Sequence, residues 1–315
     1  MSRIFYFCPD IPQPSGGVKT LYRHVDRLRQ LGWEAYIVHQ RRDFVLSWHG
    51  YTVPVLWLED RPSFGLDDLL VFPEVMSEQI RQTAGFRGQR IVIALSWAPA
   101  YARLRPGERW QDSGIRRVMT KSPLIKRYLE WSMGIDVALI AEFVDPARYW
   151  YDPAAKAPQV AYLTRKDNSG ALLQGILTRK HDRLAKLSWQ PLREMSEEVY
   201  AQHLRQASHF LTTTTQEGMH VSVLEAMACG CLVVGYAAVG GHDYMVGEGE
   251  GQNCLLVENG NLPLLGETLE RVLLDDPQRY AQVVANAVRT AQPYQAAEAE
   301  LQSLQRFFAP LIGGS

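Results

Sequence analysis

Two carboxylates flank the part of the chain that is richest in chemically useful residues. Glu217 and Glu225 are separated by seven residues. Glu217 follows an expected strand at 209–213, and the residues after it lead into an expected helix. Ligands of parallel α/β sheets bind at the carboxyl ends of strands. Unpaired N–H groups at the start of a helix attract phosphate. We therefore predict an anion site at Gly218–Val221.

The reach of Glu225 depends on where this helix begins. If it begins at Gly218, Glu225 lies about two turns into the helix. If it begins near Ser222, Glu225 lies about one turn in, and only this second geometry would let its carboxylate reach a ribose.

Strands and helices alternate along the rest of the chain. The expected strands are residues 3–8, 34–38, 69–72, 90–95, 117–120, 137–140, 159–163, 184–188, 209–213, 231–235 and 254–257. The expected helices are residues 18–31, 122–131, 196–207 and 221–229, one starting at 168, and two or three after 262 that are broken near 276–277 and at 293. This alternation is typical of doubly wound parallel sheets.

The length indicates two domains. A chain of 315 residues exceeds what one hydrophobic core usually holds. The segment 144–153 contains two prolines and is typical of a linker. We expect one Rossmann-like domain at 1–150 and a second, somewhat shortened one at 151–295.

Charge is distributed unevenly. Lys and Arg total 33 and Asp and Glu total 34, which argues against general nucleic-acid binding. Residues 103–127 are basic and interleaved with aromatics, so they form either an ordinary solvated face or a surface for anionic lipid or an anionic acceptor. The four cysteines show no CxxC pairing, and the N-terminus does not have the pattern of a signal peptide, so a cytoplasmic location is expected.

The segment EGMHVSVLEAMACGCLVV resembles the E-x7-E segment of retaining GT-B glycosyltransferases of family 4. The matching residues are Glu217, Gly218, Glu225, Ala226, Met227, Ala228, Gly230, Val233 and Val234. Weaker resemblances, in the same order, are Ser15-Gly16-Gly17, residues 116–135, Val144-Asp145 and residues 161–177. The resemblance implies a GT-B fold, with two Rossmann-like domains facing each other across a cleft and the C-terminal helix 296–315 packing back on the first domain.

The resemblance also implies roles on the donor side. Glu217 would bind hydroxyls of the donor sugar, and Glu225 would bind the ribose. Arg165 and Lys166 would stabilise the diphosphate leaving group. The implied donor-binding backbone comprises Gly16, Gly17, Gly218, Met219, His220 and Val221. No metal and no cofactor are expected, because basic side chains and helix starts would neutralise the diphosphate.

On the acceptor side the sequence departs from the family. The family often has a histidine at the end of a central strand of its first domain, where this chain has Ser96 and Trp97. We expect these two residues to line the acceptor cleft. Glu74 follows the strand at 69–72, and it is either an acceptor contact or the first-turn acid of a helix.

Other departures lie in the second domain. His220 and Cys231 stand where the family has glycine and proline, and the basic pair reads Thr-Arg-Lys instead of Gly-Arg.

The expected function is retaining transfer of a sugar from a nucleoside diphosphate sugar to a hydroxyl of a glycan, polysaccharide or lipid-linked acceptor, in glycan or polysaccharide biosynthesis. The expected location is cytoplasmic, with peripheral membrane contact through residues 103–127. Two alternatives stay open. One is a non-catalytic GT-B-like module that binds nucleotide or glycan, and the other is a nucleotide-sugar epimerase. The sequence does not indicate the donor base or sugar, the acceptor or the oligomeric state.

Overall fold

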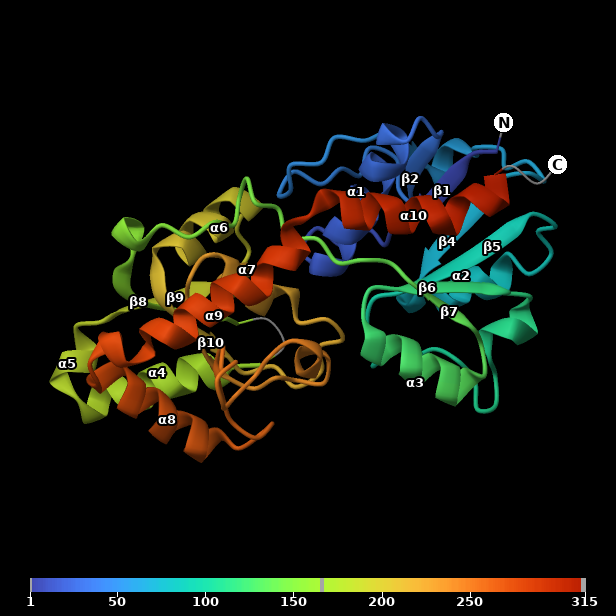
Figure 1. The fold of residues 1–315 in the computed structure, drawn as a ribbon. Coiled ribbons are helices and arrows are strands. Elements are labelled where there is room, and N and C mark those ends of the chain that lie inside the picture. The colour runs from blue at the N-terminus through green and yellow to red at the C-terminus, as the bar shows by residue number, and fades with distance from the viewer. Residues whose placement is uncertain (1, 165–166, 313–315) are drawn as a thin grey trace. The chain divides into compact units, whose positions relative to one another are not determined.

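The chain folds around two parallel sheets. A computed structural model describes residues 2–164 and 167–312 (Figure 1). The internal contacts divide the chain into unit 1, Met1–Glu142 with Ala297–Ser315, and unit 2, Phe143–Ala296. The chain therefore crosses from one unit to the other twice, after Glu142 and after Ala296.

The sheet of unit 1 has the order β3-β2-β1-β4-β5-β6-β7 within the described residues. Its strands are β1 (Ile4–Phe7), β2 (Ala35–His39), β3 (Val55–Trp57), β4 (Leu69–Pro73), β5 (Gln89–Ala94), β6 (Arg117–Thr120) and β7 (Val137–Leu139). Every neighbouring pair is parallel. From β1 the strand order runs outward to β3 on one side and to β7 on the other. The strand order therefore changes direction between β1 and β4, which is the switch point of the sheet.

Helices cover both faces of this sheet. They are α1 (Gly16–Gln30), α2 (Ser77–Gln82), α3 (Pro123–Met133) and α10 (Ala297–Ile312). Successive residues of β1 point to opposite faces, as a strand requires. Ile4 and Tyr6 pack in the cluster with α1 and α10, and Phe5 and Phe7 pack in the cluster with α2 and α3. All four side chains are buried, which explains the unbroken apolar sequence of the strand.

Unit 2 has a shorter sheet of the same kind, in the order β12-β11-β10-β8-β9. Its strands are β8 (Ala157–Leu163), β9 (Ser188–Leu192), β10 (Ala207–Thr212), β11 (Leu232–Gly235) and β12 (Leu255–Leu256). Its helices are α4 (Ser169–Lys180), α5 (Asp182–Ala185), α6 (Glu197–Gln206), α7 (Val221–Ala228), α8 (Leu262–Leu274) and α9 (Ala281–Ala291). The pairs of strands are again parallel.

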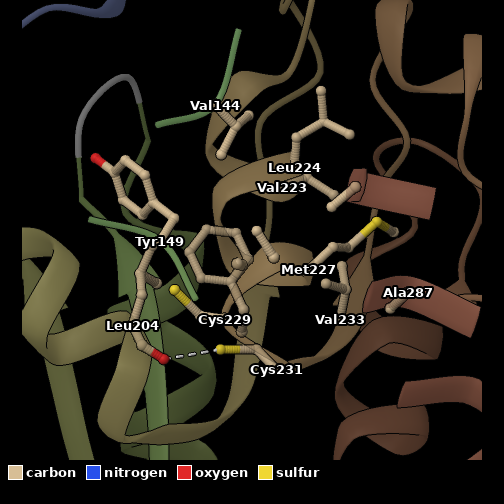
Figure 2. Packing of buried hydrophobic residues seen from close by; sticks show 14 of the residues in the cluster. Val144, Tyr149, Leu204, Val223, Leu224, Met227, Cys229, Cys231, Val233 and Ala287 are labelled. Atoms are coloured by element: carbon tan, nitrogen blue, oxygen red, sulfur yellow. Dashed lines mark hydrogen bonds between the residues drawn. The ribbon is translucent and has the colours of Figure 1, made fainter. Parts of the chain in front are cut away.

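One face of this sheet carries the core around α7. Figure 2 shows Val223, Leu224 and Met227 of α7 packed with Val233 of β11 and Ala287 of α9.

The cysteines of this core are small buried groups. Cys229 and Cys231 are free and buried in the same cluster, and the Cys231 thiol donates to the Leu204 carbonyl at 3.2 Å (Figure 2). Cys8 and Cys254 are also free and buried.

The structure confirms most expected elements and corrects one. The expected strand at 184–188 is wrong. Leu184 belongs to α5, and the strand β9 begins only at Ser188. The apolar side chains at 184 and 187 follow helical spacing, whereas Trp189 and Pro191 hide the strand signal that follows. The short elements β3 and α2 were not predicted.

The basic segment at 103–127 forms a loop, the strand β6 and the start of α3. Arg105, Arg116 and Arg117 are exposed, whereas Trp110 is 1% exposed. Within the described chain, no helix combines the length and apolarity needed to cross a bilayer. Contact of this segment with a membrane surface stays a prediction.

A buried ionic cluster holds α10 against unit 1. The Arg23 guanidinium of α1 donates to Glu142 at 2.6 Å and to Glu300 of α10 at 2.9 Å. Lys121, which follows β6, donates to the same two carboxylates. All four side chains are at most 3% exposed. Glu142 and Glu300 lie beside the two crossovers, so this cluster fixes both crossovers to unit 1.

The carboxylates of the cluster stay ionised. Burial by itself would raise the pKa of Glu300, but the charges of Arg23 and Lys121 hold that pKa well below its ordinary value. The pKa of Glu142 is lowered by the same two cations against the same opposing effect of burial. Removing one partner from such a cluster leaves a buried charge without compensation.

We therefore expect Glu300→Gln to lower the free energy of unfolding by roughly 3 kcal/mol. Because the folded-state pKa of Glu300 is depressed, its contribution is present near neutral pH and is lost as the pH falls through that folded-state value. Urea denaturation at several pH values measures both effects. Glu298→Gln is the matched control, since Glu298 lies on the same helix and is exposed. Equal unfolding midpoints for the two variants would contradict the assigned role of the cluster.

Candidate functional site

The loop between β10 and α7 lies at the carboxyl end of the unit 2 sheet. The strand β10 ends at Thr212, and α7 begins at Val221. Glu225 is the fifth residue of the helix, so it lies about one turn from the helix start. Of the two geometries considered above, this is the one that lets Glu225 reach a ribose. Glu217 is partly exposed in the loop, whereas Gly218 is buried.

The His220 side chain organises this loop from inside. His220 is 2% exposed, and its Nε2 lies 3.1 Å from the hydroxyls of both Thr212 and Thr214. Its backbone carbonyl accepts from the Tyr244 hydroxyl at 2.7 Å. The imidazole therefore ties the end of β10 to the start of α7. No side chain caps the helix at this position, among the residues described.

A second loop, which follows β11, packs against the first. The Gly240 amide donates to the Glu217 carbonyl at 3.0 Å. A Cβ atom at position 240 would lie 1.8 Å from the Gly218 carbonyl oxygen, so only glycine fits there. Asn259 holds the same loop by exchanging hydrogen bonds with the amide and the carbonyl of Ala238, at 3.1 and 3.0 Å.

The end of β8 borders the same edge, because β8 and β10 are neighbours in the sheet. The Thr213 hydroxyl lies 3.1 Å from both carboxylate oxygens of Asp167, and Asp167 also accepts from the Ser169 amide at the start of α4. The Thr164 hydroxyl is buried and has no hydrogen-bond partner among the described residues. The predicted leaving-group residues Arg165 and Lys166 lie outside the described residues.

Glu225 is 5% exposed and lies among aromatic hydroxyls. Burial and, after it, the Glu225 charge raise the pKa values of Tyr149 and Tyr200. Tyr149 comes from the segment after the first crossover, and Tyr200 comes from α6. Both phenols therefore stay neutral beside this carboxylate.

The start of α7 has the features that the predicted anion site requires. Among the described residues no side chain caps its amides, and a helix start favours negative charge. Glu217 lies before the helix, and Glu225 lies one turn into it. Anion binding at Gly218–Val221 and ligand contacts of the two carboxylates stay predictions.

In unit 1 the predicted acceptor residues Glu74 and Ser96 are in contact. Glu74 follows β4, is 3% exposed, and accepts from the amides of Leu95 at 3.0 Å and Ser96 at 2.8 Å. Its carboxylate therefore fixes the turn after β5. A Cβ atom on Gly17 would lie 3.4 Å from the Leu95 side chain, so the start of α1 lies at the same edge of the sheet.

Trp97 and Gly16 complete the placement of the predicted residues. The Trp97 ring packs edge-on against Tyr128 with centroids 6.2 Å apart, and its Nε1 is buried without a partner in the described chain. Around Gly16, a Cβ atom would meet no described atom within 4 Å. Acceptor and donor contacts for these residues stay predictions.

Within residues 2–164 and 167–312, no group of three or more His, Cys, Asp or Glu side chains is arranged to hold a metal ion. The expected independence from metal stays a prediction about the reaction.

Two further residues shape the loops at this edge and were not singled out from the sequence. Asp167 follows the basic pair, and Asn259 lies in an Asn-Gly turn. Gly240 belongs to the Gly240-Gly241 pair, which by itself predicts a turn and which the family resemblance would place beside the donor. The Gly-Gly pair was the one usable signal, because adjacent glycines can mark a close approach of two backbone segments.

Comparisons with known proteins show what this part of the chain is similar to. Residues 176–275 match the family described as glycosyl transferases group 1. The matched segment contains both Glu217 and Glu225. An alpha-1,6-glucosyltransferase of Actinobacillus pleuropneumoniae is 24% identical over 247 residues, which are 74% of this chain and 72% of that protein.

Solved structures share the fold. A sucrose-phosphate synthase from Thermosynechococcus elongatus superposes with a TM-score of 0.75 at 16% identity, covering 100% of each chain. The HepE protein of Anabaena, solved with UDP-glucose, superposes with a TM-score of 0.69 at 15% identity, covering 98% of this chain and 100% of that one. The two parallel-sheet α/β units confirm the predicted GT-B fold class.

The burial of Glu74 generates a testable pH dependence. Burial raises its pKa to about 7, although the amides of Leu95 and Ser96 act in the opposite direction. The unfolded chain releases this proton near pH 4.3. Between these values the folded state binds the proton more tightly, so the free energy of unfolding should fall as the pH rises from about 4.3 to 7.

In the wild type, the free energy of unfolding should fall by on the order of 3 kcal/mol across this pH window. We expect Glu74→Gln to abolish this fall. Denaturation midpoints at pH 5 and pH 8 measure it. Glu78→Gln is the control, because Glu78 is an exposed acid four residues along the chain. If the wild type, Glu74→Gln and Glu78→Gln proteins lose stability equally between these pH values, the assignment to Glu74 is wrong.

Proposed function

We propose that this protein is a retaining glycosyltransferase that moves a sugar from a nucleoside diphosphate sugar to an acceptor hydroxyl. One observation carries the proposal. The uncapped start of α7 lies between Glu217 and Glu225, at the carboxyl end of β10, inside the segment that matches the glycosyl transferases group 1 family.

The proposed donor is a UDP-sugar, with UDP-glucose as the first candidate. The HepE structure contains UDP-glucose, and the Actinobacillus relative is described as a glucosyltransferase. In this proposal the diphosphate binds at the α7 start and Glu225 accepts hydrogen bonds from the ribose. Glu217 accepts hydrogen bonds from sugar hydroxyls and orients the reacting carbon.

The chemistry follows from charge. Negative charge accumulates on the diphosphate as the bond from the sugar to its phosphate oxygen breaks. Fixed positive ends of dipoles stabilise such charge without reorganisation. We assign this task to the helix start and to Arg165 and Lys166, which leaves no step that requires a metal ion. A donor phosphate oxygen takes the proton of the acceptor hydroxyl. The hydroxyl oxygen attacks the reacting sugar carbon on the same face from which the diphosphate departs.

We further propose that the product belongs to glycan or polysaccharide biosynthesis. A glycan, a polysaccharide or a lipid-linked sugar each carries the hydroxyl that this reaction needs. A cytoplasmic location is proposed with it, because nucleotide sugars are substrates supplied in that compartment.

The first test is a thermal-shift series with UDP, GDP, ADP and dTDP, with and without Mg²⁺. A ligand at about 100 times its Kd adds about 2.7 kcal/mol to the free energy of unfolding. We expect UDP alone to stabilise the protein, and to do so equally with and without Mg²⁺. Stabilisation by another nucleotide instead would contradict the proposed donor base.

The second test separates the two carboxylates. We expect Glu225→Gln to weaken UDP binding about tenfold, since hydrogen bonds to charged groups contribute about 1.5–3 kcal/mol. We expect Glu217→Gln to keep UDP affinity and to lower transfer from UDP-glucose about 100-fold. Calorimetry and single-turnover assays measure the two effects, with Glu248→Gln, an exposed acid of unit 2, as the control. UDP binding without any transfer by the wild type would favour a non-catalytic binding module.

A further inference from the structure

A cavity of about 440 Å³ lies in unit 1, and its lining includes neither Glu74 nor Ser96. Residues that follow three strands line it. Cys8 and Asp10 follow β1, Arg41 follows β2, and Val75 and Met76 follow β4. In parallel α/β sheets, ligands bind outside the carboxyl ends of strands where the strand order changes direction. The cavity lies at this switch point of unit 1, and its volume is within the range of small-molecule sites.

Asp10 fixes the floor of the cavity. Its carboxylate accepts from the amides of Gln40 at 3.1 Å and Arg41 at 2.9 Å. It also accepts from His39 Nδ1 at 3.0 Å and Arg41 Nε at 3.2 Å. Burial alone would raise the pKa of Asp10, but these donors lower it. Asp10 is therefore an ionised structural group and a poor proton acceptor.

His39 supports Asp10 from behind. Because an ionised carboxylate only accepts hydrogen bonds, His39 Nδ1 donates to Asp10, and Nε2 accepts from the Tyr22 hydroxyl at 2.8 Å. Burial lowers the pKa of His39, which keeps this histidine neutral near pH 7. The chain of contacts Tyr22–His39–Asp10 holds the loop after β1 and the loop after β2 in one arrangement.

Two arginines of the cavity lining retain unused donors. Arg41 uses Nε for Asp10 and lies over the Phe44 ring at 5.0 Å, while its side chain is 59% exposed. Its two terminal nitrogens have no partner among the described residues, and the same holds for the Arg103 guanidinium. The Arg103 backbone is nevertheless held in place, because Arg81 donates to its carbonyl at 2.6 Å and pairs with Glu108 at 3.0 Å.

The lining is otherwise apolar. Leu58, Val75 and Met76 form part of the wall, and the side chains of Phe7 and Val38 close it from the core. Arg41 compensates the Asp10 charge, so the Arg103 charge remains. A matching ligand combines an apolar group with an anion.

We propose that this cavity binds the acceptor of the transfer reaction, and that it recognises a phosphate ester next to an apolar group. Arg103 and the terminal nitrogens of Arg41 donate to the phosphate, and Val75 and Met76 contact the apolar group. The role of this ligand as an acceptor rests on the proposed function, whereas binding of the phosphate ester can be tested without any transfer.

The test uses hexyl phosphate as the probe. Hexanol, which has only the apolar group, and inorganic phosphate, which has only the anion, are the two comparison ligands. We expect hexyl phosphate to bind the wild-type protein at least tenfold more tightly than either comparison ligand, as measured by calorimetry. We expect Arg103→Gln and Arg41→Gln each to weaken it about tenfold. Arg87→Gln is the matched control, since Arg87 is an exposed arginine that precedes β5, at the opposite edge of the same sheet.

A wall variant tests the same cavity without changing charge. Val75→Trp should fill part of the cavity and reduce hexyl phosphate binding about tenfold, while the melting temperature without ligand stays near that of the wild type. Equal affinities for wild type, Arg103→Gln and Arg87→Gln would overturn the proposal, as would equal binding of hexanol and hexyl phosphate.

The phosphate ester can belong to a lipid or to a soluble molecule, and a vesicle experiment distinguishes the two. Co-sedimentation with phosphatidylcholine vesicles that contain phosphatidylglycerol, competed by hexyl phosphate and weakened by Arg103→Gln, indicates a lipid phosphate. Binding of hexyl phosphate without co-sedimentation indicates a soluble phosphate ester. Parallel UDP titrations keep the two proposals distinct. Hexyl phosphate binding without binding of any of the four nucleotides contradicts the transferase proposal and leaves the binding of a phosphate ester in the cavity standing. UDP binding without hexyl phosphate binding contradicts the cavity proposal alone.

Discussion

The buried pairing of Arg23 and Lys121 with Glu142 and Glu300 is the constraint on which the rest of unit 1 depends. It joins residues that are up to 277 positions apart in the chain, and it holds both crossover segments to one sheet. An apolar core could supply the same free energy, but apolar contacts tolerate rotation and sliding of a helix. Arg23 and Lys121 are shared between two carboxylates, so only one register of α10 on α1 keeps all the buried charges paired. Any shift of the helix leaves a buried charge without a partner. The cluster therefore specifies where the last helix binds.

The loops that carry the candidate sites depend on a related use of polar groups. Asp10 and Glu74 each accept two backbone amides, and Asp167 joins Thr213 to the start of α4. Backbone groups at the ends of buried strands need partners when water is excluded. A short carboxylate can satisfy two amides at once, which makes the loop stiff where a ligand approaches. The buried His220 side chain stiffens the loop before α7 in a related way, because its Nε2 contacts the hydroxyls of Thr212 and Thr214.

The sequence predicted the strands and helices of the core well, because their apolar periodicity reflects burial that the fold then realises. It failed where the pattern was short or mixed. Leu184 and Leu187 were interpreted as a strand although the first lies in a four-residue helix, and β3 has only three partly buried residues. For the site, the expected helix at 221–229 matches the observed start of α7 at Val221, whereas the Glu217 and Glu225 spacing left open a start at Gly218 or near Ser222. The inward turn of His220 was beyond prediction, because it depends on two threonines and on Tyr244, which is 24 residues away.

The placement of charge at the strand ends separates residues that hold loops from residues that can meet a ligand. A carboxylate offers about four acceptor positions, and each position taken by a backbone amide or a side-chain donor leaves one fewer for a ligand hydroxyl. Asp10 already accepts from four donors, whereas Glu74 accepts from two backbone amides and retains acceptor capacity. Arginine differs, because its five donors let one nitrogen anchor the group while the others remain available. Arg41 shows this division, with Nε on Asp10 and its terminal nitrogens directed to no described partner. In the cavity proposal, phosphate recognition therefore falls to Arg41, which Asp10 orients, and to Arg103, whose backbone carbonyl Arg81 holds.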